Sequence, residues 1–305
     1  MELPRGGRVG VGTGARSYPD ALVIRAGDGE LTIDELASVE SYVAAASSAE
    51  ADSLPPEALK AQAIVSRSWA LANRGRHAEA GYDLCDLTHC QLYRGDQQLS
   101  SNAVAAAKAT AGLVLVSRDG GVLDAPFHSS CGGATSNASD IFGAGAGEVR
   151  GVSDLDAQGK PLCSDAKDFS WTWEVSGGEL AEAMNGRSPG DDERERMGDD
   201  EAQGTTRITR RDAAGRAIEL YVLGKRTSGR ELMSRVQKAF GYQSLRSLKF
   251  SLTLVKDRIQ FQGHGVGHGV GFCQAGAAGM AKQGARYDEI LRHYFPESVV
   301  RGVRK

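Results

Sequence analysis

Residues 55–71, PPEALKAQAIVSRSWAL, form the most clearly helical stretch of this sequence. Two prolines open it, and proline suits the start of a helix because the first N–H groups of a helix have no partner within it. Small and apolar side chains then recur on one face, which carries Leu59, Ala63 and Ala70. We expect the helix to end near residues 73–75, Asn-Arg-Gly, because glycine is typical of the position just past a helix.

Short strands and Ala-rich helices surround this helix in the sequence. Residues 34–49 and 100–111 have helical patterns, and Asp34 is the expected N-cap of the first. Alternating apolar pieces broken by Gly and Asp predict strands within residues 8–33. Further strands are expected at 113–117, 171–175, 205–211, 217–223, 247–255 and 258–262, and further helices at 229–240, 275–283 and 287–294. Because no regular βαβ order occurs, the sequence predicts a mixed α+β fold with largely antiparallel strands.

The length allows one large domain or two modest ones. We expect either a single domain over residues 1–305 or two lobes, at about 1–130 and 131–300. An acidic run, DDERERMGDDEAQ, indicates a solvated insertion near residues 185–204. Residues 132–168 are rich in Gly, Ser and Asp without a sustained period, which is typical of a functional loop.

The charge balance is close to neutral, with 36 Lys and Arg residues against 39 Asp and Glu residues and a formal net charge of −3. This balance argues against bulk electrostatic binding of nucleic acid. No run of about 18 apolar residues occurs, so we expect no membrane-spanning helix. Residues 1–14, MELPRGGRVGVGTG, lack the basic and apolar regions of a signal peptide.

The sharpest chemical signal is the stretch at residues 263–274, GHGVGHGVGFCQ. Its glycines allow the backbone to approach a ligand or another strand closely. His264 and His268 are four residues apart, but a glycine-rich backbone does not form the helix of the two-histidine zinc motif, which also needs a Glu between them. The pattern favours a substrate cleft, and zinc ligation or a tight turn are the alternatives.

A second signal is a set of cysteines and histidines that begins after the proline-capped helix. Two thiolates and two imidazoles can complete a tetrahedral zinc site, although this spacing is not that of a common zinc finger. Alternatives are a Cys85–Cys90 or Cys131–Cys163 disulfide, unpaired thiols, or a Cys131 nucleophile, which lacks a supporting triad order. The candidate ligands are His77, Cys85, His89, Cys90, His128 and Cys131.

Glu50 lies between the Ala-rich helix and the proline-capped helix. A carboxyl group at such a junction can be partly buried, which raises its pKa and suits it to general acid catalysis. The alternative is a solvated loop carboxylate, which the spacing alone favours. Arg67 lies on the proline-capped helix and carries no functional signal from the residues alone.

Five segments together resemble the stage II sporulation protein D family, also called the amidase-enhancer family. They follow one another in the family's order from about residue 30 to residue 298. The segments are PPEALKAQAIVSRSWAL, CDLTHCQLYRG, FHSSCGGATSNASDIFG, SLRSLKF and GHGVGHGVGFCQAGAAGMAKQGARYDEILRHYFP.

The resemblance implies a lytic transglycosylase, which cleaves the MurNAc–GlcNAc bond of peptide-stripped peptidoglycan strands and leaves 1,6-anhydro-MurNAc ends. It implies Glu50 as the single catalytic carboxyl group, first an acid and then a base. Arg67 is implied to bind sugar oxygens or to orient Glu50. His264, His268 and Gln274 are implied to line a glycan-binding cleft.

The same resemblance implies a structural zinc ion, which stiffens the fold and takes no chemical part. Its expected ligands are Cys85, His89 and Cys90, with His77 or Cys131 as the fourth. No organic cofactor is expected.

Three features depart from the family pattern. Residues 50–52 are Glu-Ala-Asp where members usually have Glu-Met-Pro. Ala275 replaces a Trp that commonly follows the Gln of the last motif, which removes one sugar-stacking surface. The acidic insertion is also atypical of the family.

Two alternative functions remain from the sequence. The family name allows a non-catalytic glycan-binding protein that enhances a separate cell-wall amidase, and a zinc hydrolase using His264 and His268 is a third interpretation. Peptidoglycan glycan strands are the expected partner in the first two cases, joined by an amidase in the enhancer case. Because peptidoglycan lies outside the cytoplasmic membrane, we expect the protein in the cell envelope, periplasm or medium, with its leader removed from this sequence.

Overall fold

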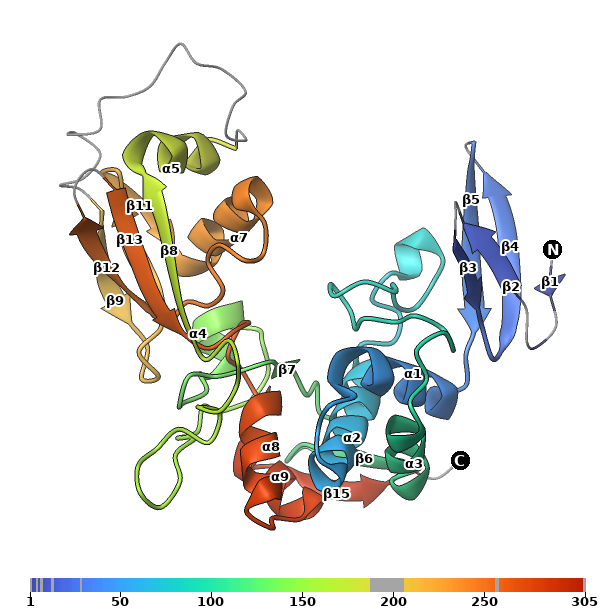
Figure 1. The fold of residues 1–305 in the computed structure, drawn as a ribbon. Coiled ribbons are helices and arrows are strands. Elements are labelled where there is room, and N and C mark those ends of the chain that lie inside the picture. Colours follow the sequence, from blue (N-terminus) through green and yellow to red (C-terminus); the bar gives the residue numbers. More distant parts are fainter. Residues whose placement is uncertain are drawn as a thin grey trace. The chain divides into compact units, whose positions relative to one another are not determined.

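The computed structural model describes residues 2–3, 5, 8–11, 14–27, 29–186, 206–255 and 258–303. The chain divides into two compact units (Figure 1). The first unit is Met1–Pro126 with Met280–Lys305, and the second is Phe127–Gly279. The lobes expected from the sequence ran to about 130 and from 131 to 300, whereas the C-terminal residues here join the first unit. Most of the expected insertion near 185–204 lies outside the described residues.

The helices α1, α2 and α3 contact one another and form the centre of the first unit (Figure 1). Small side chains line their contacts, and two clusters of buried residues hold them together: Val43, Ala44, Ala63 and Ala107, and then Ala51, Leu59, Ala103 and Ala106. Alanine faces let helix axes approach closely and still exclude water from both surfaces. The helices of this unit are α1 (Val39–Ala51), α2 (Pro56–Ala72), the 3-10 helix η1 (Ala78–Ala80), α3 (Ser101–Ala109) and α9 (Tyr287–Tyr294).

Polar caps explain where these helices begin. The Ser38 hydroxyl accepts from the backbone N–H of Ser41 at the start of α1, and Ser100 does the same for α3. The expectation that Asp34 caps the first helix is wrong, because Asp34 lies in a strand and the helix begins five residues later. Helix α2 begins at Pro56 and ends at Ala72, as its sequence predicts.

The strands of the first unit pair antiparallel in three small sheets. β4 is the centre of one sheet, with β1 and β5 on its two sides, while β2 pairs with β3 and β6 pairs with β15. The strands are β1 (Glu2–Leu3), β2 (Arg8–Val11), β3 (Gly14–Ser17), β4 (Ala21–Gly27), β5 (Glu30–Leu36), β6 (Leu113–Val116) and β15 (Val299–Gly302).

The second unit contains two antiparallel three-stranded sheets and a short parallel pair. Its sheet orders are β12-β13-β8 and β11-β10-β9, and β7 pairs in parallel with β14. The strands are β7 (Phe127–His128), β8 (Ser170–Ser176), β9 (Arg207–Arg211), β10 (Ala217–Val222), β11 (Lys225–Ser228), β12 (Phe250–Val255), β13 (Arg258–His264) and β14 (Phe272–Cys273).

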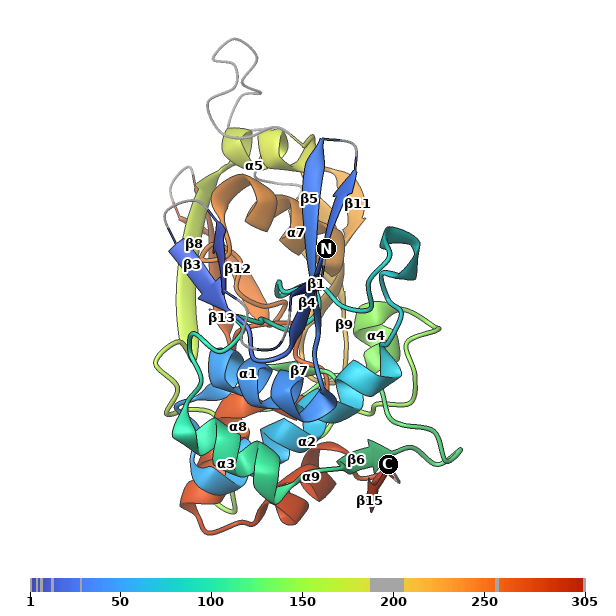
Figure 2. The ribbon, with the colours of Figure 1, turned by 90° about the vertical axis from the view of Figure 1, so that its right-hand side faces the viewer.

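Helices α5 and α7 lie beside these sheets and contact one another (Figure 2). The helices of the second unit are α4 (Ala138–Phe142), α5 (Gly177–Met184) and α7 (Gly229–Phe240), while α8 (Gln274–Lys282) begins in this unit and ends in the first. The expected α+β class with antiparallel strands is therefore confirmed. Within the described residues, every helix is too short or too polar to cross a membrane.

The guanidinium group of Arg67 joins the elements of the first unit. The Arg67 side chain is fully buried, and its Nε and Nη2 donate to the two carboxylate oxygens of Glu40 at 3.1 and 2.7 Å. Its remaining donors reach the carbonyl oxygens of Ala107 on α3, at 3.3 Å, and of Leu113 on β6, at 3.1 Å. One side chain of α2 thus connects α1, α3 and β6.

This geometry corrects the expectation that Arg67 contacts a sugar or orients Glu50. The side chain has no exposed surface, and its hydrogen bonds go to Glu40 and to backbone carbonyls. Removal of a guanidinium group enclosed in this way would leave its buried partners unpaired, which would lower the free energy of unfolding. We therefore assign Arg67 a structural role.

We predict that Arg67→Ala destabilises the first unit by about 3 kcal/mol or more, because it leaves two buried carbonyls and one carboxylate without their donor. Glu40→Gln is the milder comparison and costs less than Arg67→Ala, because Glu40 is 44% exposed and the amide oxygen still accepts one hydrogen bond from the guanidinium group. Hydrogen exchange of the α1 and α2 amides in the full chain measures both. Native exchange rates in Arg67→Ala would contradict the structural assignment.

Candidate functional site

Glu50 lies in the last turn of α1, so it is not the solvated loop carboxylate of the alternative interpretation. Its side chain is half-buried, and Oε1 accepts a 2.7 Å hydrogen bond from the backbone N–H of Leu92. Burial raises the pKa of Glu50, and the hydrogen bond from Leu92 only partly opposes this effect. The C-terminal end of a helix carries partial negative charge, which also favours the protonated carboxyl group. Glu50 therefore has the properties of a proton donor.

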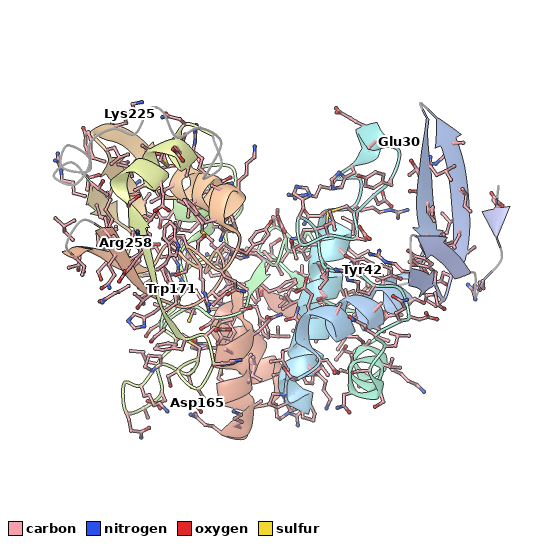
Figure 3. All side chains as sticks on the ribbon, turned by 45° about the horizontal axis from the view of Figure 1, so that its top comes forward. Glu30, Tyr42, Asp165, Trp171, Lys225 and Arg258 are labelled. Carbon is pink, nitrogen blue, oxygen red and sulfur yellow. The ribbon has the colours of Figure 1, made fainter. Side chains whose placement is uncertain are left out.

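Tyr42, labelled in Figure 3, lies on the same helix as Glu50, and the sequence analysis missed it. Burial, and then the charges of Cys90, Glu50 and Cys85, raise the pKa of Tyr42 above its usual range. Its ring stacks on Tyr93 with centroids 5.4 Å apart. Its hydroxyl group is buried and has no hydrogen-bond partner among the described residues. The sequence signal that could have identified Tyr42 is its position two helical turns before Glu50.

Four side chains on the loop after α2 gather their ligand atoms within 4.8 Å of one another. The distances from Cys90 Sγ are 3.4 Å to His77 Nε2 and 3.8 Å to His89 Nδ1, and Cys85 Sγ also lies 3.8 Å from His89 Nδ1. Tetrahedral zinc with Zn–S near 2.3 Å and Zn–N near 2.0–2.1 Å separates sulfur and nitrogen ligands by about 3.6 Å. The residues present thus fit a Cys₂His₂ metal site.

The loop that carries His77, Cys85, His89 and Cys90, called the Cys/His loop below, also contacts Glu50. Leu92, whose N–H donates to Glu50, follows Cys90 by two residues. Between them, the fully buried Gln91 donates through Nε2 to the carbonyl oxygen of Ser66 on α2. Cys90, two residues earlier, and the hydrogen bond from Gln91 to α2 therefore constrain the position of the Leu92 amide.

The fourth member of this group is His77, and Cys131, the other candidate from the sequence, does not belong to it. Cys131 belongs to a second group in the second unit, with Asp154, Cys163 and Cys273. All five cysteines are free thiols, and the sequence-based disulfides are absent from the structure. The sequence analysis missed Asp154 and Cys273 as members of a cluster, because they are far apart in the sequence and follow no known spacing.

The expected glycan-contacting residues lie in the second unit and differ in accessibility. His264 is exposed, and its Nδ1 lies 3.1 Å from the Ser170 hydroxyl. His268 is half-buried, its Nδ1 accepts from the backbone N–H of Val270, and burial lowers its pKa to about 4. Gln274 is buried at the start of α8. Neither histidine belongs to a group of potential metal ligands within the described part of the chain.

The glycines between these histidines pack against protein. A Cβ atom at Gly265 would lie 2.5 Å from the carbonyl oxygen of Ser130, and one at Gly269 would lie 2.1 Å from the guanidinium group of Arg216. Both glycines also have positive φ angles, 77° and 76°. Close approach of chain segments to one another therefore accounts for these two glycines.

Comparison with known protein families gives two matches. The model described as Stage II sporulation protein matches residues 27–116, which include α1, α2 and the Cys/His loop. A model described as a domain of unknown function, DUF8618, matches residues 156–271 of the second unit.

Three curated relatives cover most of the chain. An uncharacterized protein of Brachyspira hyodysenteriae is 28% identical over 92% of this chain and 71% of its own length. Stage II sporulation protein D of Bacillus amyloliquefaciens is 26% identical over 79% of this chain and 67% of its own. The amidase enhancer of Bacillus subtilis is 24% identical over 79% of this chain, which spans only 37% of that relative. By its motifs and these matches, the chain is similar to members of the stage II sporulation protein D and amidase enhancer family.

Proposed function

We propose that this protein is a lytic transglycosylase of the bacterial cell wall and that Glu50 is its catalytic acid and base. The observation that carries the proposal is the half-buried carboxyl group of Glu50, with its raised pKa and its hydrogen bond from Leu92. The names of the relatives, a stage II sporulation protein D and an amidase enhancer, support a cell-wall role. This role places the protein in the cell envelope.

In this mechanism the protonated Glu50 donates its proton to the glycosidic oxygen between MurNAc and GlcNAc. The C1–O bond breaks, and positive charge develops at C1 of MurNAc. The Glu50 carboxylate then removes the proton of the MurNAc 6-hydroxyl group, whose oxygen bonds to C1 and closes the 1,6-anhydro ring. The proton that Glu50 gives away is thus returned, and no water is consumed.

One carboxyl group is sufficient for this reaction, because the same group acts first as the acid and then as the base. Burial raises the pKa of Glu50, which suits it to the first step. Ordinary glycosidases use a pair of carboxyl groups.

A zinc ion bound by His77, Cys85, His89 and Cys90 would have four protein ligands and no open position, as in structural zinc sites. In our proposal these residues position the Leu92 amide and take no part in proton transfer. In the second unit we propose His264 as a glycan contact because it is exposed. His268 and Gln274 remain weaker candidates, because one uses its Nδ1 internally and the other is buried.

We predict that Glu50→Gln abolishes the release of anhydro-MurNAc products from peptide-stripped peptidoglycan, because the amide cannot donate and accept the proton. Glu79→Gln, which changes an exposed carboxylate on η1, is the control and retains activity. Mass spectrometry of the soluble products measures both. Hydrated reducing ends from the wild type would mean a hydrolase and would contradict the mechanism.

The same experiment tests the alternative function, a non-catalytic enhancer of an amidase. An enhancer would pull down glycan strands and stimulate an added cell-wall amidase without releasing soluble products of its own. It would also keep its full effect in Glu50→Gln. Either observation, with no products from the wild type, would replace the transglycosylase proposal.

We predict that Glu50→Gln is more stable than the wild type at pH 7. Because the folded-state pKa of Glu50 lies above its ordinary value of 4.5, ionisation at rising pH favours the unfolded chain. Below about pH 4.5 both states hold the proton, so the difference between wild type and variant disappears there. Thermal unfolding across this pH range measures the effect, with Glu79→Gln as the reference. A stability difference independent of pH would contradict the raised pKa.

We predict that the double variant His77→Ala/Cys85→Ser binds one zinc ion fewer per chain than the wild type. Its activity falls about 10- to 100-fold without vanishing, because the Leu92 amide is less well positioned while Glu50 is intact. Metal analysis and product release measure the two effects. Complete loss of activity in a folded variant would instead indicate a catalytic metal.

A further inference from the structure

The second unit contains another group of potential metal ligands, which the proposed function does not use. The ligand atoms of Cys131, Asp154, Cys163 and Cys273 lie within 4.8 Å of one another, and all four residues are buried. Cys131 follows β7, Cys273 ends β14, and the other two lie on the irregular segment between α4 and β8. Side chains from three segments, remote in the sequence, thus meet at one point.

The distances fit one metal ion better than a disulfide. The sulfur atoms of Cys131 and Cys163 are 3.7 Å apart, whereas the two sulfurs of a disulfide are about 2.05 Å apart. Two thiolates on a tetrahedral zinc ion, with Zn–S near 2.3 Å, are separated by about 3.8 Å. Cys131 Sγ lies 2.9 Å from Asp154 Oδ2, the separation of a thiol donating a proton to a carboxylate. Metal binding would displace that proton.

Backbone N–H groups point at the sulfur atoms in the manner of a thiolate site. Cys273 Sγ accepts from the N–H of Cys131 at 3.2 Å and from the N–H of Gly276, in the first turn of α8, at 3.3 Å. Cys131 Sγ accepts from the N–H of Gly133 at 3.3 Å. Such outer hydrogen bonds, and the N-terminus of a helix, stabilise the deprotonated sulfur that a metal requires.

Two cations lie against the same backbone. The buried Arg216 donates to the carbonyl oxygen of Cys131 at 2.7 Å, and Lys249 Nζ donates to that of Gly132 at 2.7 Å. Asp212 accepts from the backbone N–H of Arg216 and adds one negative charge. Three thiolates, Asp154, Asp212 and the two cations sum formally to −3, which a divalent ion reduces to −1. With the three thiols protonated the same groups are neutral overall, so a divalent ion is what would allow the thiols to lose their protons here.

We propose that Cys131, Asp154, Cys163 and Cys273 bind a second metal ion, of the zinc class, with a structural role. Three sulfur ligands and one oxygen ligand suit tetrahedral zinc, and four protein ligands leave no open position. The ion joins the glycine-rich segment after β7 to the segment that carries His264 and His268. These two segments already share hydrogen bonds, between Ser130 and Val266 in both directions and from Ser136 to Gly269.

The decisive experiment uses the full-length His77→Ala/Cys85→Ser variant, in which the first metal site is disabled and the second cluster is intact. Purified under reducing conditions and supplied with zinc, it should retain one zinc ion per chain by native mass spectrometry and elemental analysis. Cobalt substitution should give the charge-transfer and ligand-field absorption of a tetrahedral thiolate site. Absence of metal, with Cys131, Cys163 and Cys273 reacting as free thiols or two of them joined in a disulfide, would overturn the proposal.

A matched pair of variants in the same background tests the ligands. Asp154→Asn should weaken zinc binding more than about tenfold in a competition with a chelator, because it removes a charged ligand. Asp156→Asn, two residues along the loop and outside the cluster, should leave zinc binding unchanged. Equal affinities in the two variants would contradict the assignment of Asp154. Both readouts are metal content, so they are independent of any transglycosylase activity.

Discussion

The buried guanidinium group of Arg67 is the interaction on which the first unit depends. It lies on α2 and satisfies a carboxylate on α1 and carbonyl oxygens on α3 and β6. These elements otherwise meet through small alanine faces, which bury little apolar area per residue and specify register weakly. A charged group with fixed bidentate geometry supplies that specificity. This connection fixes α2 against α1, α3 and β6.

Two constraints then meet at Glu50. The helix carries the carboxyl group to a half-buried position, and the loop after α2 brings the Leu92 amide to its Oε1 atom. That loop has little regular structure, and the hydrogen bond from Gln91 to Ser66 connects it to α2. A half-buried carboxyl group with a raised pKa lowers the free energy of unfolding near neutral pH. Catalytic groups are often kept in such unfavourable positions because a raised pKa is what the reaction needs.

The second unit is organised differently, around glycines and thiols. The glycine and histidine segment is drawn against the segment after β7, and Gly265 and Gly269 occupy places where a side chain would collide with protein. The cysteine cluster lies next to the same contact. Packing of chain segments therefore explains Gly265 and Gly269, which the sequence suggested for a substrate cleft. His264 is exposed, so it is the better candidate for a substrate contact.

The sequence by itself determined the α+β class, the extent of α2, the family resemblance and the candidate status of Glu50, Cys85, His89 and Cys90. These follow from local periodicity, from caps and from ordered motifs, all of which act over short stretches of chain. Only the tertiary structure decided that Arg67 is structural, that His77 is the fourth member of the first cluster, and that Cys131 belongs with Asp154, Cys163 and Cys273. Burial and ligand distance depend on segments remote in the sequence, and no local pattern encodes which of them come together.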